Sequence, residues 1–227
     1  MHSPRLELRR VSKIYQSNGQ KLEALCDVSL ALEPATVTAL VGRSGCGKTT
    51  LLNLAGAMDF PTSGEVLIEG RPTNSLSETE LTALRRRHIG FVFQFFQLLP
   101  TLSVLENVEL PLLLAGTADS VAIARDRLRW VELEDKAEAF PYQLSGGQMQ
   151  RAAVARALVH SPDILIADEP TGNLDDASGE QVLRLLRESA ERYGATVLMA
   201  THSEEAAAIA SMRVHMRDGR IASAVRS

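Results

Sequence analysis

The sequence of 227 residues has few cysteines, little net charge and no long apolar run, and each shortage excludes a class of protein. Its two cysteines, Cys26 and Cys46, form no C-x-x-C pair, which argues against a disulfide framework or a zinc site and fits a reducing compartment. A formal net charge of −4 provides no basic stripe for a phosphodiester backbone, so nucleic acid is not expected as a partner. No stretch reaches the roughly 20 apolar residues that cross a bilayer, and no apolar segment follows residues 1–10. We therefore expect a cytoplasmic chain that is neither exported nor membrane-spanning by itself.

The apolar patterns that are present predict one α/β domain over residues 1–227. Residues 6–15 and 28–32 partly alternate between apolar and polar side chains, as antiparallel strands with one wet face do. Residues 37–41 instead form a short apolar run, typical of a strand covered on both faces in a parallel sheet. Further strands are expected at residues 66–68, 89–93, 164–167 and 196–200, and helices at 48–56, 121–131, 148–159 and 203–211. The sequence also predicts a capping box at Ser77–Glu80 and a hairpin at Asp218-Gly219.

The strand pattern disappears between residues 95 and 160. This Leu- and Ala-rich stretch contains Pro100, Pro111 and Pro141, which we expect to divide it into separate helices. The predicted organisation is therefore a core of residues 1–94 and 161–227, with an antiparallel portion at its start and a helical subdomain inserted over residues 95–160.

A glycine-rich loop between the strand at 37–41 and the helix at 48–56 predicts a nucleoside triphosphate site. The loop follows the pattern G-x-x-x-x-G-K and then Ser or Thr, and it reads Gly42-Arg43-Ser44-Gly45-Cys46-Gly47-Lys48-Thr49; the next residue, Thr50, is also expected to bind the nucleotide. Its glycines let backbone N–H groups curl around an anion, and the helix N-terminus adds about half a positive charge. Lys48 is placed to meet the outer phosphates, and Thr49 to offer a hydroxyl to Mg²⁺. A glycine-rich turn with a surface lysine is the plainer interpretation, and the flanking strand and helix argue against it.

Polar residues follow three further strands at their carboxyl ends, where open α/β sheets bind ligands. Asp168 is expected to serve the metal, and Glu169 to take the proton of a water near the γ-phosphate. His202 is placed to touch the γ-phosphate or hold this water, although in isolation a surface histidine is the plainer interpretation. Gln94 has the same status: it ends a strand where it can sense metal or water and report this to the helical insertion.

A second anion-binding helix start lies at Leu144-Ser145-Gly146-Gly147-Gln148, just before the helix at 148–159. The phosphate site of the same subunit has little use for it, so its phosphate must come from elsewhere. A plain helix cap after Pro141 would explain Ser145, but not two glycines and Gln148 together with the other motifs.

In this order the motifs resemble those of the ATP-binding subunit of ABC transporters, over essentially the whole chain. The resembling segments are Gly42–Thr49 for Walker A, Gln94 for the Q-loop, Leu144–Gln148 for the signature, Ile164–Glu169 for Walker B, Asn173–Asp175 for the D-loop and His202 for the H-loop. The resemblance implies a P-loop NTPase core that uses ATP and Mg²⁺ and acts as a head-to-tail homodimer in the ATP-bound state.

The same resemblance assigns roles to single residues. It implies that Lys48, Thr49, Gln94, Asp168, Glu169 and His202 serve ATP from one copy, and that Ser145, Gly147 and Asp175 reach across from the other. It also places Tyr15 where the family stacks an aromatic ring on adenine, a contact that aromatic geometry permits. An ordinary core tyrosine is the alternative interpretation at this position.

Within the family, Phe93–Leu102 and Asp168–Asp175 look most like the lipoprotein-release and macrolide-exporter group, with LolD- and MacB-like members. This implies an integral membrane permease as partner and a place on the inner face of the cell membrane through it. One alternative is a regulatory ATPase like the FtsE-type cell-division subunit, which signals without moving a solute. Another is a soluble ABC ATPase, and the acidic pI argues against the members of that class that act on DNA or the ribosome.

Cys46 departs from the commonest residue of its loop. It is interpreted as a small packing residue or, as a hypothesis, as a thiol whose alkylation slows turnover.

Overall fold

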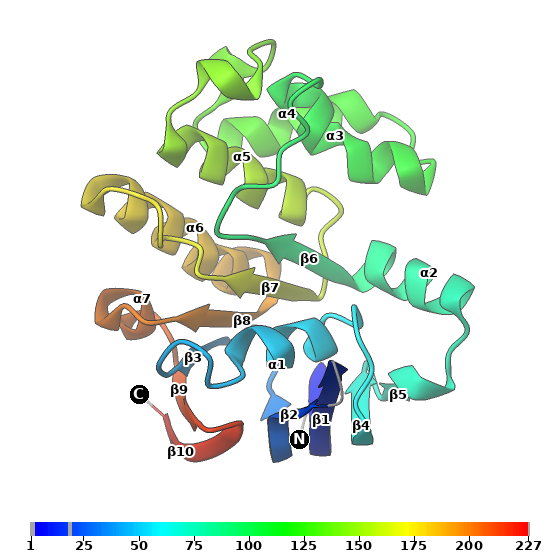
Figure 1. The fold of residues 1–227 in the computed structure, drawn as a ribbon. Helices are drawn as coiled ribbons and strands as arrows, with labels where there is room; N and C mark the ends of the chain where they lie inside the picture. Colours follow the sequence, from blue (N-terminus) through cyan, green and yellow to red (C-terminus); the bar gives the residue numbers. More distant parts are fainter. Residues whose placement is uncertain (1–2, 18–19, 227) are drawn as a thin grey trace.

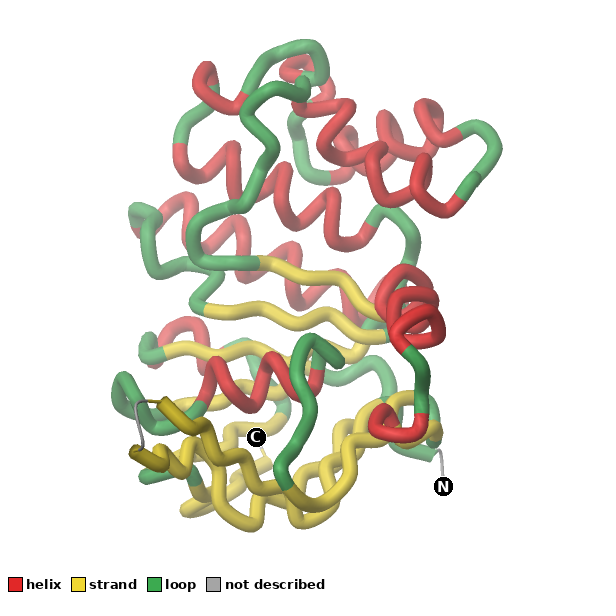
Figure 2. The backbone as a smooth tube through the Cα atoms, turned by 45° about the vertical axis from the view of Figure 1, so that its right-hand side comes forward, coloured by secondary structure: helices red, strands yellow, loops and turns green. Residues whose placement is uncertain are grey.

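The computed structural model describes residues 3–17 and 20–226, in which a strand-rich part lies below a group of helices (Figure 1). Colouring the backbone by secondary structure separates the two parts (Figure 2). The architecture is mixed α/β, as predicted, with one mainly parallel and one antiparallel sheet. Among the described residues, no helix combines the length and apolar character that a membrane crossing requires.

The larger sheet has the strand order β10-β9-β3-β8-β7-β6 and is parallel from β9 to β6. Its central strands are short apolar runs because both faces of the sheet are covered; every residue of β8 is buried. Since these strands are parallel, the residues that follow β3, β6, β7 and β8 emerge at one edge, and this edge positions the site. The strands are β3 (Val37–Val41), β6 (Ile89–Val92), β7 (Ile164–Asp168), β8 (Thr196–Thr201), β9 (Met212–Arg217) and β10 (Arg220–Arg226).

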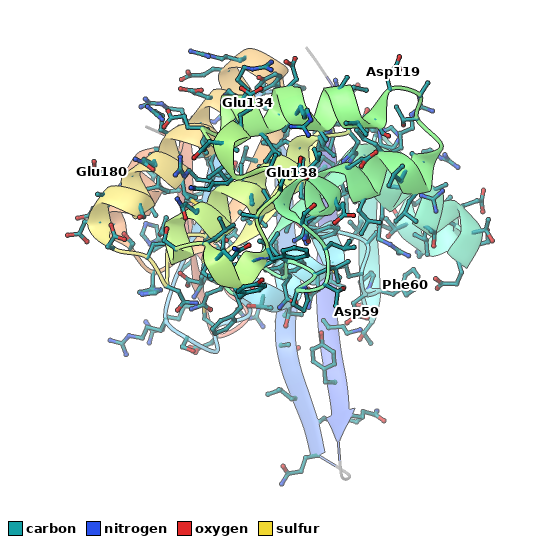
Figure 3. All side chains as sticks on the ribbon, turned by 90° about the horizontal axis from the view of Figure 1, so that it is seen from above. Asp59, Phe60, Asp119, Glu134, Glu138 and Glu180 are labelled. Carbon is teal, nitrogen blue, oxygen red and sulfur yellow. The ribbon has the colours of Figure 1, made fainter. Side chains whose placement is uncertain are left out.

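The smaller, antiparallel sheet has the order β2-β1-β4-β5. Its strands are β1 (Leu6–Ser17), β2 (Gln20–Leu32), β4 (Ser63–Ile68) and β5 (Arg71–Pro72). Seen from above, β1 and β2 reach out beyond the rest of the protein (Figure 3). The first part of β2 carries no clear alternation, because residues 20–23 are all exposed, and the pattern therefore predicted a strand only from residue 28.

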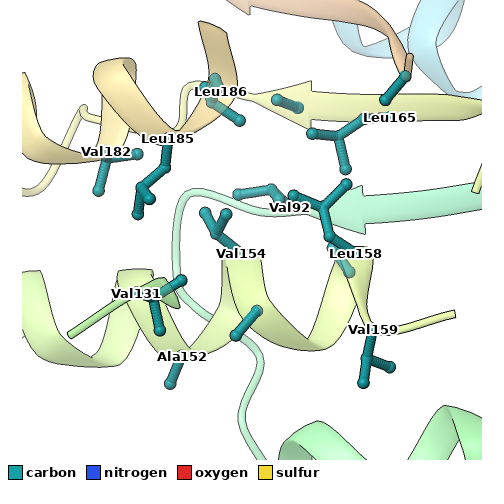
Figure 4. Packing of buried hydrophobic residues seen from close by; sticks show 14 of the residues in the cluster. Val92, Val131, Ala152, Val154, Leu158, Val159, Leu165, Val182, Leu185 and Leu186 are labelled. Carbon is teal, nitrogen blue, oxygen red and sulfur yellow. The ribbon is translucent and has the colours of Figure 1, made fainter. Parts of the chain in front are cut away.

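Helices fill the space on both faces of the larger sheet. The helix α1 (Lys48–Ala55) lies between the two sheets, where Leu51 and Leu54 are fully buried. On the opposite face, α5 (Gly146–Leu158) and α6 (Asp176–Tyr193) cover β6 and β7. Val154 and Leu158 of α5, Leu186 of α6 and Leu165 of β7 belong to one buried cluster there (Figure 4).

No strand of the described residues falls between 95 and 160, as predicted. This stretch forms α3 (Val104–Ala115), α4 (Ser120–Trp130) and α5. The prediction that Pro111 divides helices is wrong, because Pro111 lies inside α3. Its missing N–H costs one helical hydrogen bond, which the capping box at Ser103 and the buried face with Val108 and Leu112 offset.

Two other helices position loops around the core. The helix α2 (Glu78–His88) starts at the predicted capping box, in which Ser77 and Glu80 bond to each other's backbone N–H groups. The helix α7 (Glu204–Ala208) is shorter than the predicted 203–211. It ends early because the N–H of Ser211 already donates to the carbonyl of Val37, which leads the chain into β9.

Candidate functional site

A cleft of about 950 Å³ opens at the edge of the larger sheet where the parallel strands end. It is bounded by the phosphate loop, by the residues that follow β6, β7 and β8, and by parts of β1, β2 and the turn between β9 and β10. The lining residues are Tyr15, Leu22, Glu23, Ala24, Ser44, Gly45, Gly47, Lys48, Thr49, Thr50, Gln94, Asp168, Glu169, His202, Asp218 and Gly219. Eleven of these sixteen are residues that the sequence predicted for ATP or Mg²⁺.

The phosphate loop has the backbone that the glycine pattern predicts. Gly47 has φ +103°, and a Cβ there would lie 2.6 Å from the carbonyl oxygen of Ala24, so only glycine fits. Gly47 caps α1 without a side-chain hydrogen bond, and the first turn of the helix contains no acidic residue. The N-terminus of α1 therefore presents free N–H groups and partial positive charge to an anion.

Lys48 is folded back onto its own loop and is only 8% exposed. Its Nζ donates to the carbonyl oxygens of Gly42 at 2.7 Å and of Arg43 at 3.3 Å. Gly42, Arg43 and Cys46 belong to the loop but not to the wall of the cleft. Cys46 is buried, with its sulfur packed against Gly42, as the interpretation of a small packing residue predicted.

A hydroxyl and a carboxylate meet where a metal ion was predicted. Thr49 Oγ1 donates to Asp168 Oδ2 at 3.0 Å. Burial raises the pKa of the Asp168 carboxyl; the bond from Thr49 opposes this rise, and the neighbouring charge of Glu169 adds to it. A divalent cation beside Asp168 would compensate this poorly solvated charge, and both side chains offer the oxygen ligands that Mg²⁺ prefers.

The described residues contain no group of three or more His, Cys, Asp or Glu that could hold a metal ion by itself. A cation at Thr49 and Asp168 would therefore take its remaining ligands from phosphate oxygens and water, which is how Mg²⁺ commonly binds at nucleotide sites. The residues present fit such an ion.

Glu169 and His202 form a second polar pair in the cleft. His202 Nδ1 lies 2.8 Å from Glu169 Oε2, and the backbone N–H of His202 points to the same oxygen at 3.4 Å. Glu169 has φ +46°, just past the end of β7, and its N–H donates to the carbonyl of Ala200 on β8. Two neighbouring strands thus hold a carboxylate and an imidazole together, an arrangement that can accept a proton from a water molecule.

Gln94 lines the same cleft from the loop after β6. Its carbonyl accepts a hydrogen bond from Asn173 Nδ2 at 3.0 Å, which joins this loop to the segment after β7. A third element joins them as well: Gln150 of α5, which is fully buried, donates to the carbonyls of Phe93 at 3.2 Å and Pro170 at 2.6 Å. Sequence reasoning missed Gln150, because nothing local distinguishes it from a surface glutamine.

The helix start at Ser145 does not reach this cleft. Ser145 Oγ accepts from the N–H of Gln148 at 3.3 Å, and Gln148 Oε1 accepts from the N–H of Ser145 at 2.9 Å, which closes a capping box. A Cβ on Gly147 would lie 2.4 Å from Ser178 Oγ, so α5 begins against the first turn of α6. None of the residues from Leu144 to Gln148 lines this cleft.

Asp175 also lies outside the cleft and lines a neighbouring hollow of about 670 Å³. It caps α6, where its carboxylate accepts from the N–H and the hydroxyl of Ser178. The bond from the backbone N–H of Ser178 and that from its side chain lower the pKa of Asp175. Glu169 and His202 line both this hollow and the cleft, so the two are adjacent.

The remaining lining residues come from segments that lie outside the predicted nucleotide-binding motifs. Gly219, in the turn between β9 and β10, donates its N–H to the carbonyl of Cys46 at 3.1 Å and accepts from the N–H of Cys26 at 2.8 Å. The turn therefore joins β2 to the phosphate loop. The Asp-Gly pair indicated a hairpin, but its position at the cleft follows only from the strand order β10-β9-β3.

Comparison with known proteins identifies relatives along nearly the whole chain. The sequence profile of the ABC transporter family matches residues 25–172. The chain is 44% identical over 225 residues to the macrolide export ATP-binding/permease protein MacB of Burkholderia pseudomallei, covering 97% of the chain and 34% of that protein. It is 45% identical over 218 residues to an uncharacterized ABC transporter ATP-binding protein of Methanocaldococcus jannaschii, covering 95% and 97%.

A solved structure is similar over the same extent. The dimeric structure of an ATP-binding cassette, in a post-hydrolysis state bound to ADP and Pi, matches with a TM-score of 0.90 and 40% identity, covering 97% of this chain and 98% of that one. The chain thus spans the length of this cassette but about a third of the MacB relative.

Proposed function

Because the chain belongs to the ABC transporter family and is one of its ATP-hydrolysing cassettes, we propose that two copies close head to tail around two ATP molecules and drive a conformational change in a membrane permease. The observation that carries this proposal is that α1 begins at the cleft whereas α5, the other helix with an anion-binding start, begins outside it. A second copy supplies the missing helix start. The dimeric state of the similar cassette supports two copies.

Within one copy, the residues of the cleft have different roles in binding and hydrolysing ATP. Lys48 exchanges its bonds to loop carbonyls for the outer phosphates, which the N–H groups of the loop also bind. Thr49 and Asp168, with Gln94, hold Mg²⁺, which neutralises phosphate charge when bound. Glu169, oriented by His202, accepts the proton of the water that attacks the γ-phosphate.

Across the dimer, the start of α5 and the cap of α6 bind the ATP of the other copy, through Ser145, Gly146, Gly147, Gln148 and Asp175. Hydrolysis removes the γ-phosphate that these groups share with the opposite loop and so weakens the contact. We propose that residues 95–160 move relative to a core of residues 1–94 and 161–227 during this cycle. The contacts of Gln150 support this coupling, because they tie α5 to the two loops that carry Gln94 and Glu169.

The partner in this proposal is an integral membrane permease of the exporter or lipoprotein-release type, and the chain is peripheral on the inner face of the cell membrane through it. The identity to a protein named as a macrolide export ATP-binding/permease supports this class of partner. The net charge of −4 supports the absence of nucleic acid from the assembly.

The dependence of specific ATPase activity on protein concentration tests the dimer. If only a closed dimer hydrolyses ATP, activity per mole of chain rises with concentration and then reaches a plateau. A constant specific activity over about a hundredfold dilution, across which sedimentation shows the chain to be monomeric, would contradict the proposal.

The permease requires its own test. A tagged chain purified from membranes in mild detergent should retain an integral permease, and adding that permease to the isolated chain should change its ATPase rate. Recovery of the chain only in complexes that hold no integral membrane protein would contradict the transport role, while leaving the dimeric ATPase intact.

A further inference from the structure

The ring of Tyr15, on the wall of the cleft, is held by two charged side chains. Its hydroxyl donates to Asp59 Oδ2 at 2.9 Å. Lys13 Nζ lies 4.9 Å from the centre of the ring and 2.6 Å from Asp59 Oδ1, and it also donates to the carbonyl of Phe60 at 2.8 Å. One carboxylate therefore joins both side chains, which lie two residues apart on the same face of β1.

Asp59 is itself firmly placed. Its Oδ1 also accepts the N–H of Phe60 at 2.7 Å. Burial would raise the pKa of Asp59, but the hydrogen bonds from Lys13, from the N–H of Phe60 and from Tyr15 together lower it, so the carboxylate stays ionised. The Lys13 side chain is 13% exposed and that of Asp59 29%, so this pair is better shielded than the neighbouring pair of Arg10 and Asp27, at 84% and 56%.

Tyr15 needs such a support because of its place in the sheet. The ladder between β1 and β4 ends at Ser12, so Tyr15 lies in the part of β1 that pairs only with β2 and projects from the protein. A two-stranded ribbon is weakly ordered by itself. Asp59 and Phe60, labelled in Figure 3, lie beside the base of this ribbon, in the segment that follows α1.

The helix α1 thus connects the two ends of the cleft. It begins with Lys48 at the phosphate loop, and four residues after it ends comes Asp59, which holds the ring. Since α1 is short and packed between two sheets, the distance from the loop to the ring is set by a rigid element.

We propose that Asp59 and Lys13 are positioning residues that orient Tyr15 as the platform for the adenine base and keep it in register with the phosphate loop. Lys13 lies over one face of the ring, and in this proposal the base stacks on the other. Leu22, the cross-strand neighbour of Tyr15, is 66% exposed and lines the cleft beside it, as the apolar edge of the same platform. This inference rests on the proposed ATP site with Tyr15 stacked on the base.

A ring that is already oriented loses little freedom when the base stacks on it, so breaking the anchor weakens binding only through the base. Asp59→Asn in the full chain is expected to raise the dissociation constant for ATP with Mg²⁺ by about 3- to 10-fold, measured by calorimetry. KM for ATP rises by the same factor, whereas kcat falls by less than about twofold.

A double-mutant cycle separates this role from a merely structural one. Tyr15→Ala removes the platform, so adding Asp59→Asn to Tyr15→Ala should weaken ATP binding no further. Tyr15→Phe keeps the ring and the Lys13–Asp59 pair but removes the hydroxyl that donates to Asp59, so it should also weaken ATP binding, which keeps the test open if Asp59→Asn folds poorly. The control is Asp27→Asn, since Asp27 is an ion-paired carboxylate on β2 that does not line the cleft.

If Asp59→Asn weakens ATP binding as much without the Tyr15 ring as with it, or not at all, the positioning role is wrong. If Tyr15→Ala binds ATP as tightly as the parent chain, the platform itself is wrong and the inference falls with it. If the parent chain binds no ATP, the failure lies in the proposed site and not in the anchor.

Discussion

Glu169 Oε2 lies 2.8 Å from His202 Nδ1, so two residues that are 33 positions apart in the chain share one hydrogen bond at the edge of the sheet. The side chain of Glu169 is 17% exposed and that of His202 is 70% exposed. The carboxylate is thus shielded and oriented, while the imidazole faces the open side of the cleft. This geometry suits a base whose direction is set by a neighbour.

Replacing Glu169 by glutamine should retain ATP binding but lower hydrolysis by roughly 10²- to 10⁴-fold, because the amide keeps the shape and cannot take a proton. Single-turnover hydrolysis and equilibrium ATP binding are the measurements. The variant should also stay dimeric in ATP, since the γ-phosphate is not removed. Glu138→Gln, at an exposed carboxylate paired with Arg125, is the control and should hydrolyse normally. Turnover of Glu169→Gln at the parent rate would show that another group is the base.

Replacing Ser145 by arginine should leave ATP binding to the single chain intact but prevent the closed dimer. The added bulk and charge occupy the start of α5, which the other copy's phosphates must approach. Size-exclusion chromatography in ATP and Mg²⁺, in the Glu169→Gln background, measures this. Ser223→Arg, at an exposed position of β10, should dimerise normally. A dimer of the Ser145→Arg variant with parental affinity would refute the head-to-tail arrangement.

His160 should make the fold less stable as the pH falls. Burial, and to a smaller extent the charge of Arg127, lower its pKa below the ordinary value of 6.5, against the opposing bond to the carbonyl of Ile89. Between the pKa of His160 in the unfolded chain and its lower pKa in the folded chain, the unfolded chain binds more protons. The contribution of His160 to stability is therefore fully present above pH 6.5 and is lost as the pH falls towards the pKa in the folded chain.

The variant His160→Leu removes this proton-binding difference and also the buried Nδ1, for which the described part of the chain provides no hydrogen-bond partner. The loss of melting temperature between about pH 7.5 and pH 5 should therefore be smaller in the variant than in the parent chain. ATPase activity at pH 8 should stay within about twofold, because His160 does not line the cleft. An unchanged or steeper pH dependence of melting would contradict the assignment.

Local sequence patterns predicted an element well where a uniform environment, such as burial on both faces, determines its residue types. The strand Val37–Val41 was predicted at its observed bounds, because a strand covered on both faces is mostly apolar. The first half of β2 was missed, because an exposed ribbon imposes no such pattern. Pro111 was misjudged for the opposite reason: tertiary burial of α3 overrides the local preference of proline.

The amino-acid sequence by itself determined the phosphate loop, the capping boxes and the strand that ends in Asp168-Glu169. These features depend on backbone conformation and on neighbours a few residues away. Only the tertiary structure decided that Asp59 meets Tyr15, that Gly219 joins β2 to the phosphate loop, and that Gln150 ties two loops to α5. Such contacts join segments whose distance is set by sheet order and helix packing, and a hydrogen bond between distant residues has no periodicity by which the sequence could reveal it.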